Sequence, residues 1–407
     1  MEIITGQYGR ALLTIPASSI EATCLAQITA FVNHPAFTGL IVIMPDTHAG
    51  KGAVIGFTMP LGGMVVPNVV GGDIGCALYA ICFGRDLPIA AEDIDRFVRA
   101  HVPFGMAANP RPLLDMARDF PWKRANELAA QFTARYAEAF GESLRPPRYG
   151  LDWFLAKCAA IGAKEQWIVN SLGSMGGNNH FIEIGRAQSD GRLWLTVHSG
   201  SRNFGTKIAQ HWQDLAAKRH PDCDRELAWL EGEDAAGYLF DMVFAQVYAE
   251  TNRRLIAETL RRAMGAEVLD EVHTVHNFID FGDFVIRKGA VRSYVGERLL
   301  VPFNRQAGIL LCEGKSNPGW NRSAPHGAGR LMSRGDARRK LDVVEYQQQM
   351  RGIFSSTVGA DTIDEAPGAY KDPAFIEAAI GPTATILDRI IPIYSFKDDT
   401  REARRRR

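Results

Sequence analysis

The chain has 407 residues, 46 Lys and Arg balanced by 46 Asp and Glu, and 46% hydrophobic residues. This length and composition exclude a disordered chain, a collagen, a coiled coil and a small disulfide scaffold. Zero net charge gives no overall attraction to nucleic acid or to membranes, although it allows a local basic groove. The six cysteines show no CxxC spacing and the first residues lack a signal-peptide pattern, so we expect a reduced, cytoplasmic protein.

The first 85 residues alternate apolar runs with Gly-rich turns, which predicts strands joined by loops. The runs occupy residues 40–45, 53–60, 63–67 and 77–84. Residues 52–72 carry no charge and are long enough to cross a bilayer, but prolines and glycines interrupt them repeatedly. Buried strands fit this pattern better than a helix does, and we expect no membrane partner.

Helical and strand-like blocks then alternate along the rest of the chain. Helical periodicity marks residues 88–99, 122–140, 151–163 and a long block at 204–268, with a Pro-rich irregular stretch at 105–121. Strands are predicted at 166–173, 180–187, 193–200, 284–291, 293–296, 299–303 and 308–312, with a hairpin turn at 185–191. The pattern predicts an α+β fold whose β-rich pieces form one large core. We expect one catalytic domain over residues 1–400 and a basic tail at 401–407.

Polar and metal-binding residue types are concentrated in the Gly-rich turns. Seven turns have this character: MPDTHAGKG (44–52), VGGDIGCA (70–77), SLGSMGGNNHFIEI (171–184), VHSGSRNFG (197–205), HNFIDFG (276–282), RKGA (287–290) and SAPHGAGR (323–330). Glycine allows positive φ and close approach of a ligand. Because several strand ends carry such turns, we predict one composite site built from them.

A metal site is one interpretation of these turns. Asp73 and Cys76 lie three residues apart, while His180, His198 and His276 each lie at a predicted strand end. A carboxylate, a thiolate and three imidazoles suit Mn, Fe, Co or Zn better than Ca, and a thiolate can bridge two ions. The alternative is a small buried cysteine and hydrogen-bonded structural histidines.

His326 is a candidate nucleophile because it precedes a Gly-Ala-Gly turn whose backbone N–H groups could cradle a phosphate. The alternative is a structural turn. The GKS at 314–316 lacks P-loop spacing, and no dinucleotide-binding fingerprint is complete,. Basic residues beside the turns could form a groove for nucleic acid or a solvated face; these are Lys51, Arg202, Lys207, Arg287, Lys288 and Arg330.

The chain resembles the RtcB family of RNA-splicing and RNA-repair ligases. The matching segments are MPDTHAGKG, VGGDIGC, GGNNHFIEI, VHSGSRNFG, HNF, RKGA, SAPHGAGRLMSR and PGAYKD, in the family's order from about residue 40 onward. Residues 105–165 match no motif of that family. The resemblance implies an RtcB-like α+β fold and a GTP-dependent and Mn²⁺-dependent RNA ligase. Its substrates would be RNA ends with a 3′-phosphate or 2′,3′-cyclic phosphate and RNA ends with a 5′-hydroxyl, as in tRNA splicing or RNA repair.

The resemblance also assigns roles to individual residues. His326 would attack the α-phosphate of GTP, and Asp46 would lie near the pyrophosphate leaving group. Asp73, Cys76 and His180 would hold one Mn²⁺ ion, and Cys76, His198 and His276 the other. Nucleotide contacts would come from Asn179, Phe181, Glu183, Asn277, Gly327, Ala328, Gly329 and Lys397.

One loop departs from the family pattern. Many members have Pro-Gly-Ser-Met where this chain has Pro302-Phe303-Asn304-Arg305, and a later Ser corresponds to Ile309. Phe in place of Gly restricts the backbone and could narrow the nucleotide pocket. Two other functions therefore stay open: a metal-dependent cyclic phosphodiesterase or phosphatase that does not ligate, and a nucleic-acid-binding protein without catalysis.

We expect the protein to be a monomer.

Overall fold

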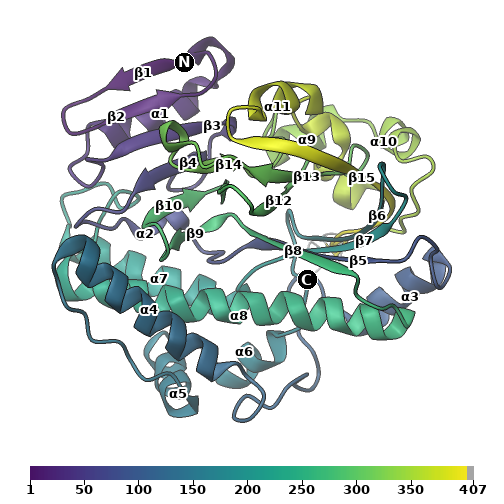
Figure 1. Ribbon diagram of the computed structural model, residues 1–407, viewed down its shortest axis with the longest axis horizontal. Coiled ribbons are helices and arrows are strands. Elements are labelled where there is room, and N and C mark those ends of the chain that lie inside the picture. Colours follow the sequence, from purple (N-terminus) through teal and green to yellow (C-terminus); the bar gives the residue numbers. More distant parts are fainter. Residues whose placement is uncertain (401–407) are drawn as a thin grey trace.

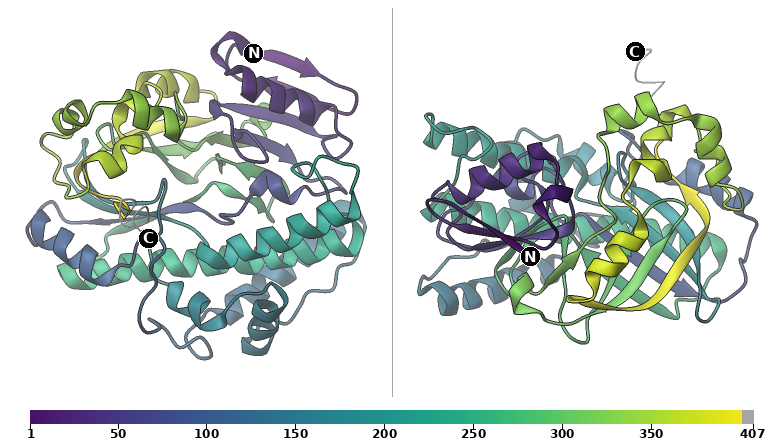
Figure 2. Two further views of the ribbon diagram at one scale, coloured as in Figure 1. Left: turned by 180° about the vertical axis from the view of Figure 1, so that it is seen from behind. Right: turned by 90° about the horizontal axis from the view of Figure 1, so that it is seen from above.

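The computed structural model describes residues 1–400 and consists of two large β-sheets with helices on their outer faces (Figure 1). The α+β fold class is therefore confirmed. The tail predicted at 401–407 lies outside the described residues. The sheets lie next to one another above the long helix α8, and the helices α4 to α7 lie on the same side as α8. A smaller group of helices near the C-terminal end covers the opposite side (Figure 2).

The larger sheet has seven antiparallel strands in the order β12-β13-β15-β6-β7-β5-β8. Its strands are β5 (Ala77–Phe83), β6 (Phe181–Ala187), β7 (Leu193–Ser199), β8 (Asp270–Val275), β12 (Arg298–Pro302), β13 (Ile309–Gly314) and β15 (Ala384–Phe396). The two edge strands β8 and β12 approach each other, because the Leu300 N–H donates to Thr274 Oγ1 at 3.0 Å and Arg298 forms an ion pair with Asp270. The sheet therefore curls into a nearly closed barrel.

The second sheet has six strands in the order β1-β2-β3-β4-β10-β9, and only the β2–β3 pair is parallel. Its strands are β1 (Glu2–Thr5), β2 (Arg10–Leu13), β3 (Leu40–His48), β4 (Ile55–Pro60), β9 (Asn277–Asp280) and β10 (Val285–Lys288). Two short strands, β11 (Ala290–Arg292) and β14 (Ser323–Pro325), pair with each other. Since β8 leads into β9 through His276 alone, the chain passes from one sheet to the other at a predicted metal ligand.

Helices bury their apolar faces against the sheets and against one another. The α-helices are α1 (Ala22–Val32), α2 (Pro67–Val70), α3 (Ala91–His101), α4 (Trp122–Phe140), α5 (Leu151–Ala160), α6 (Glu165–Ser171), α7 (Arg202–Arg219), α8 (Gly232–Met264), α9 (Arg334–Lys340), α10 (Val343–Gln349) and α11 (Pro373–Ile380). Short 3₁₀ turns occur at Ala17–Ser19, Pro318–Trp320, Ala360–Glu365 and Pro367–Ala369. The helix α8 runs the length of the molecule, and its middle is buried beneath both sheets.

Most predicted elements are present, although the hairpin turn expected at 185–191 lies at 188–192. Four other predictions were wrong. Residues 166–173 were expected to form a strand, but α6 covers most of them. The segment 293–296 is not a strand, and 63–67 contributes one isolated bridge, at Val65, before α2 begins. The helix α1 lies within residues expected to be strands and loops, because its buried face, which includes Ile28 and Phe31, packs into the core. The irregular stretch at 105–121 contains no helix or strand.

All six cysteines are free, and five of them are buried. Within residues 1–400, no helix combines the length and the apolar character that a membrane crossing requires. The uncharged segment 52–72 forms strand β4 and helix α2 instead.

Candidate active site

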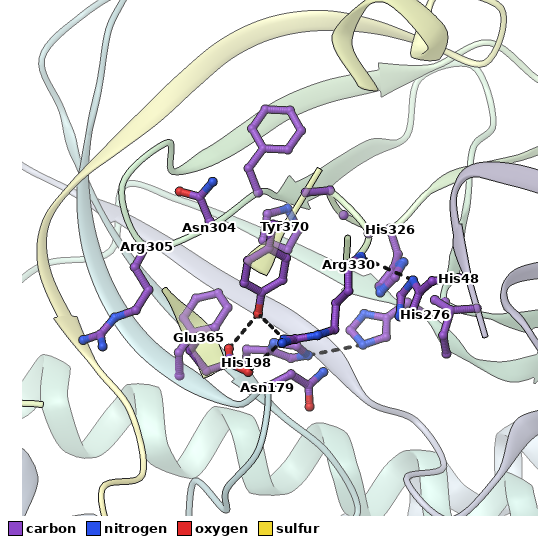
Figure 3. Close-up of a pocket in the computed structure, with 18 of the residues that line it drawn as sticks. His48, Asn179, His198, His276, Asn304, Arg305, His326, Arg330, Glu365 and Tyr370 are labelled. Atoms are coloured by element: carbon purple, nitrogen blue, oxygen red, sulfur yellow. Dashed lines mark hydrogen bonds and ion pairs between the residues drawn. The ribbon is translucent and has the colours of Figure 1, made fainter. Parts of the chain in front are cut away.

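Six of the seven Gly-rich turns, all but the one at 70–77, line a cavity of about 490 Å³ where the two sheets meet (Figure 3). The cavity is lined by all the residues that were predicted to contact a nucleotide, by the candidate nucleophile and by two of the metal-ligand candidates. The lining includes Asn179, Phe181, Glu183, His198, His276, Asn277, His326, Gly327, Ala328, Gly329 and Lys397. Cys76 and His180 lie next to His198 in this wall, Asp73 lies next to His180, and Asp46 is buried behind His326.

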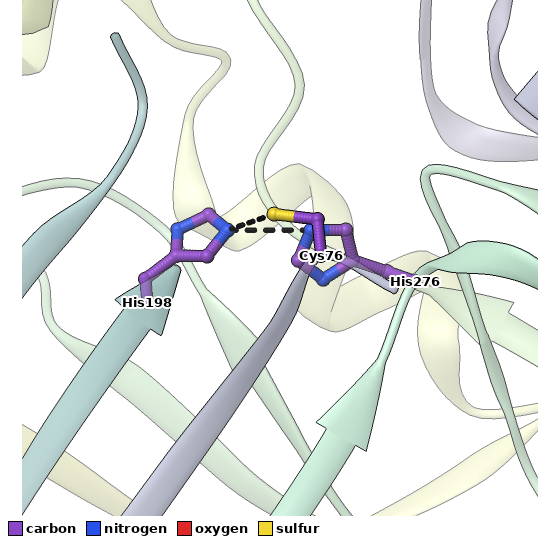
Figure 4. A group of neighbouring side chains, drawn as sticks. All are labelled: Cys76, His198 and His276. Atoms are coloured by element: carbon purple, nitrogen blue, oxygen red, sulfur yellow. Dashed lines mark hydrogen bonds between the residues drawn. The ribbon is translucent and has the colours of Figure 1, made fainter. Parts of the chain in front are cut away.

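Strand register brings three metal-ligand candidates together (Figure 4). Cys76 immediately precedes β5, which pairs with β7 on one side and with β8 on the other. His198 lies in β7 and His276 immediately follows β8, so the three side chains come from neighbouring strand ends. Cys76 Sγ is 3.2 Å from His198 Nε2, and His198 Nε2 is 3.2 Å from His276 Nε2.

A second group of candidate ligands shares Cys76. His180 Nε2 lies 3.4 Å from Cys76 Sγ and 2.8 Å from Asp73 Oδ2. His180 Nδ1 lies 2.9 Å from the Met175 carbonyl, which orients Nε2 toward the other ligands when Nδ1 carries the proton,. A Cβ at Gly200 would come within 2.0 Å of Asp73 Oδ1, so only glycine allows the carboxylate to approach this closely.

The donor set fits a cation. Ligand atoms about 2.0–2.3 Å from one ion lie roughly 3–4 Å from each other, and the candidate ligand atoms of each group here lie within 4.8 Å of one another. Burial and neighbouring histidines lower the pKa of His198 well below its usual value, and burial and His198 do the same for His276. Burial raises the pKa of Asp73, but His180 outweighs this effect and lowers it overall. The neutral imidazoles of His198 and His276, together with His180, a carboxylate and a buried thiol, form a borderline-soft site for a divalent transition metal,.

His326 is held from behind by Asp46. The carboxylate oxygen Oδ2 of Asp46 lies 2.6 Å from His326 Nδ1 and accepts the backbone N–H groups of His326 at 3.0 Å and Gly327 at 3.2 Å. Asp46 is fully buried at the end of β3. Because Nδ1 donates to this carboxylate, Nε2 is left with a free lone pair. His276 lies next to this ring, with 5.1 Å between ring centroids.

The far end of the cavity contains an ion cluster around Glu365. Lys397 forms an ion pair with Glu365 and donates to the Asn179 carbonyl at 3.2 Å. Tyr370 also donates to Glu365, at 2.7 Å, and Arg334 pairs with the same carboxylate. Burial raises the pKa of Glu365, but these cations outweigh it and keep the carboxyl ionised.

The loop that departs from the family pattern is fastened by Arg305, which is 3% exposed. Its guanidinium donates to Ser355 Oγ at 2.6 Å, to Thr357 Oγ1 at 2.9 Å and to the Ser395 carbonyl at 3.1 Å. Phe303 lines the cavity but packs mainly into an apolar cluster of the core. The Phe303 side chain is therefore buried, and Arg305 connects the loop to the end of β15 by a hydrogen bond.

Several residues of the site were not predicted. Glu365, Tyr370 and Arg334 line the cavity, as does His48, whose pKa burial lowers to about 4. Tyr370 lies in the PGAYKD segment and Arg334 ends the SAPHGAGRLMSR segment, so both motifs carried a signal. Glu365 lies in a 3₁₀ turn without glycine, and its sequence offers no signal that could have identified it.

Over most of its length, the chain is similar to proteins described as RNA-splicing ligases. The profile of the family described as tRNA-splicing ligase RtcB matches residues 27–397. The RNA-splicing ligase RtcB of Escherichia coli strain K12 is 30% identical over 417 residues, which cover 93% of this chain and 95% of the relative. The RNA-splicing ligase RtcB2 of E. coli strain ATCC 25922 is 27% identical, with coverage of 97% and 98%. The tRNA-splicing ligase RtcB of Archaeoglobus fulgidus is also 27% identical, with 86% of each chain covered.

Proposed function

Because the chain belongs to the RtcB family of RNA-splicing ligases, we propose that it joins RNA ends through a covalent histidine–GMP intermediate. One end carries a 3′-phosphate or a 2′,3′-cyclic phosphate, and the other carries a 5′-hydroxyl. GTP is the proposed energy source, and two Mn²⁺ ions are the proposed cofactors. The observation that carries this proposal is the Asp46–His326 pair, whose free Nε2 lies beside the Cys/His cluster.

The first proposed step is nucleophilic attack by His326 Nε2 on the α-phosphorus of GTP. A P–N bond forms, the bond from that phosphorus to the β-phosphate oxygen breaks, and pyrophosphate leaves. Asp46 keeps the ring proton on Nδ1 and stabilises the positive charge that the ring gains. Its direct contact with the ring supports an orienting role more than contact with the leaving group.

Two further transfers complete the reaction. An oxygen of the RNA 3′-phosphate attacks the histidine-bound phosphorus, so that the P–N bond breaks and GMP passes to the RNA. The 5′-hydroxyl oxygen then attacks the RNA 3′-phosphorus, loses its proton and displaces GMP, which leaves a 3′,5′-phosphodiester. A 2′,3′-cyclic phosphate must first add water and open to the 3′-phosphate.

The two ligand groups can hold the proposed ions. Asp73, Cys76 and His180 would hold one, and Cys76, His198 and His276 the other. When bound, two divalent ions neutralise phosphate charge and orient the attacking oxygen. The five side chains that would hold the ions lie in a water-poor environment, since four of them are buried.

Glu183 supports guanine as the base. Its Oε1 is buried without a hydrogen-bond partner among the described residues, and Glu183 lines the same cavity as Phe181 and Lys397. When this carboxyl is ionised, its buried acceptor oxygen favours a ligand that brings an N–H donor, which the Watson–Crick edge of guanine provides. Lys397 lies 5.5 Å from the centroid of the Phe181 ring and could donate to a base carbonyl.

Covalent labelling tests the proposal. Purified protein is incubated with Mn²⁺ and GTP labelled at the α-phosphate, and an acid-labile, base-stable adduct is expected. His326→Ala should abolish the adduct, whereas His101→Ala, which alters an exposed histidine on α3, should keep it. Sealing of a 3′-phosphate end to a 5′-hydroxyl end should show the same dependence.

The phosphodiesterase alternative predicts a different result. The altered loop at 302–309 motivates it, but Arg305 and Phe303 give that loop an ordered place in the wall of the cavity. Opening of a cyclic phosphate without GTP, combined with no adduct and no sealing, would favour hydrolysis alone. Absence of sealing under any condition with Mn²⁺ and GTP would refute the ligase.

A further inference from the structure

Two adjacent polar residues are buried in the middle of α8. Asn252 is fully buried, and Arg253 is 1% exposed, beneath the Gly-rich turns that carry the metal-ligand candidates. A buried arginine and a buried asparagine are costly unless their polar atoms are hydrogen-bonded. Both side chains point into the turns rather than toward solvent, and their hydrogen-bond partners in the turns indicate their role.

Arg253 binds the backbone next to two metal-ligand candidates. Its Nη1 atom donates to the Gly75 carbonyl at 2.7 Å and to the Ser199 carbonyl at 2.9 Å. Gly75 immediately precedes Cys76, and Ser199 immediately follows His198. One nitrogen atom thus sets the separation of two backbone segments that each present a ligand. Nε and Nη2 donate to His273 Nε2 at 3.2 and 2.9 Å, which fixes the plane of the guanidinium.

Asn252 binds the turn that orients a third ligand. Its Oδ1 accepts the backbone N–H groups of Gly173 at 2.8 Å and Ser174 at 3.1 Å. Its Nδ2 donates to the Ser174 carbonyl at 3.1 Å and to Ser199 Oγ at 3.0 Å. The next residue of this turn, Met175, supplies the carbonyl that faces His180 Nδ1.

The network closes between these contacts. Ser199 Oγ donates to the Met175 carbonyl at 2.7 Å, and Asn252 Nδ2 also donates to the Gly200 carbonyl at 3.1 Å. Gly200 is the residue whose missing Cβ allows Asp73 to approach. Contacts from two neighbouring helical residues therefore reach the backbone beside four of the five ligand candidates.

We propose that Asn252 and Arg253 are positioning residues that hold three turns in register for metal binding. Neither residue touches the cavity or would touch an ion. They act through Gly75, Ser199 and the 173–175 turn, as outer partners do when they orient the ligands of a metal. The inference deepens the proposed function, on which its metal-binding part rests.

Arginine is required at this position for a geometric reason. Its planar fork offers five N–H donors in fixed directions, so that two carbonyls and a histidine can be bound at once. Lysine keeps the charge but is a single flexible ammonium group, and it can replace only part of this pattern. Arg253→Lys therefore loses hydrogen bonds that hold the turns in register, but it keeps a buried cation beside Asp73 and Cys76.

Hydrogen–deuterium exchange on the metal-free protein tests the register directly. Arg253→Lys should raise exchange in peptides covering 73–77 and 196–201, and Asn252→Ala in those covering 171–177, with other core peptides unchanged. The matched control is Arg254→Lys, because Arg254 is the next residue on α8 but pairs with Glu250 and Glu271 near the surface. If Arg253→Lys is too unstable to purify, Asn252→Ala and Asn252→Asp carry the comparison.

Metal affinity provides the second measurement. Mn²⁺ titration followed by electron paramagnetic resonance should show affinity lowered about 10- to 100-fold in Arg253→Lys and unchanged in Arg254→Lys. Co²⁺ substitution should show a weakened thiolate–cobalt absorption band, which a loss of global stability alone would not produce.

The two hypotheses can fail separately. Failure of the wild-type protein to bind Mn²⁺ or Co²⁺ would refute the metal part of the proposed function, and the exchange comparison would still decide the register. Exchange in Arg253→Lys and Asn252→Ala identical to wild type, or wild-type metal affinity in both variants, would overturn the positioning role.

Discussion

The two walls of the cavity are built in different ways. On the side of His326, three hydrogen bonds converge on Oδ2 of Asp46 and fix the His326 ring, while Oδ1 of Asp46 is buried without a partner among the described residues. On the opposite side, His198 and His276 point their Nε2 atoms at each other, and their Nδ1 atoms are buried without a partner among the described residues. Glu183 Oε1 in the same wall is also unpartnered.

The two walls therefore depend on a ligand to different degrees. The candidate nucleophile His326 is oriented by the protein alone, since its tautomer follows from Asp46. Both walls contain unpartnered buried atoms, but only the opposite wall brings the buried Nε2 atoms of two histidines together, where a bound cation would contact both. We expect substitutions on the nucleophile side to change rates, and changes on the other side to alter stability and ligand affinity.

The largest expected effect is on the nucleophile side. Asp46→Asn replaces a carboxylate with an amide that can donate to Nδ1, so the ring proton moves to Nε2 and the lone pair is lost. The rate of guanylate formation should fall by about 10³–10⁴-fold, as for the equivalent change in a Ser-His-Asp triad. Single-turnover labelling measures this rate. Mn²⁺ affinity should stay at the wild-type value, and a joint loss of both would contradict the separation.

Glu183 predicts a pH dependence of stability. Burial raises its pKa from an ordinary 4.5 to about 8, although Arg305 and Lys397 oppose the rise. Between these values the unfolded chain releases the proton while the folded chain keeps it, so the free energy of unfolding falls as pH rises from 4.5 to 8 and then levels off. The Glu183→Gln variant has no titrating carboxyl at this position, so its free energy of unfolding should not fall in this way.

Urea unfolding of the metal-free protein at several pH values measures the effect. The stability of Glu183→Gln relative to wild type should increase by a few kcal/mol between pH 5 and pH 8. Parallel profiles for the two proteins would show that the carboxyl is ionised in the folded state throughout. Asp190→Asn, in an exposed turn, serves as the control.

Metal addition should raise the free energy of unfolding by less than the difference expected for Glu183→Gln. Ligand at one hundred times its dissociation constant adds about 2.7 kcal/mol to the free energy of unfolding when it binds only the native state. Mn²⁺ should produce this gain in wild type and in Asp46→Asn, and His198→Ala should lose most of it. Thermal or urea unfolding with and without Mn²⁺ measures it. An equal gain in His198→Ala would mean that the metal binds elsewhere.

The smallest expected effect concerns the unusual loop. Arg305→Met removes the bonds that tie residues 302–309 to Ser355, Thr357 and Ser395. The apparent KM for GTP should rise by about tenfold, which corresponds to about 1.4 kcal/mol, while the rate at saturation changes little. Arg389→Met, at a partly exposed arginine of β15, is the comparison. A large fall in the saturated rate with unchanged KM would contradict a binding role.

Much of the site could be predicted because its residues lie in turns that sequence alone makes conspicuous. Glycines beside Asp73, His198 and His326 indicated where backbone and ligand approach closely, and the structure brings these residues to one cavity. The contact between Asp46 and His326 spans 280 positions of sequence, and no local pattern reports it. Asn252 and Arg253 were missed for the same reason, since they look like ordinary residues of a helix.

The errors in the fold have local causes. Residues 166–173 contain Trp167, Ile168 and Val169, which favour strands on propensity, yet α6 forms there because Ile168 is buried in the apolar cluster to which α7 and α8 also contribute. Strand β15 was not predicted, although it is the longest strand, because Pro392 interrupts its pattern and three exposed residues follow its start. A bulge near Pro392 accommodates the proline, as is typical of proline within sheets.

The position of β15 has a consequence for the order in which the molecule assembles. This strand, made last among those described, lies between β13 and β6, which is almost 200 residues earlier in the chain. During synthesis, the partly made barrel therefore remains split into two pieces with exposed edges. Such distant pairings form slowly. Lys397, directly after β15, closes the end of the cavity around Glu365, so an interrupted chain has the candidate metal ligands and His326 but lacks this end of the cavity.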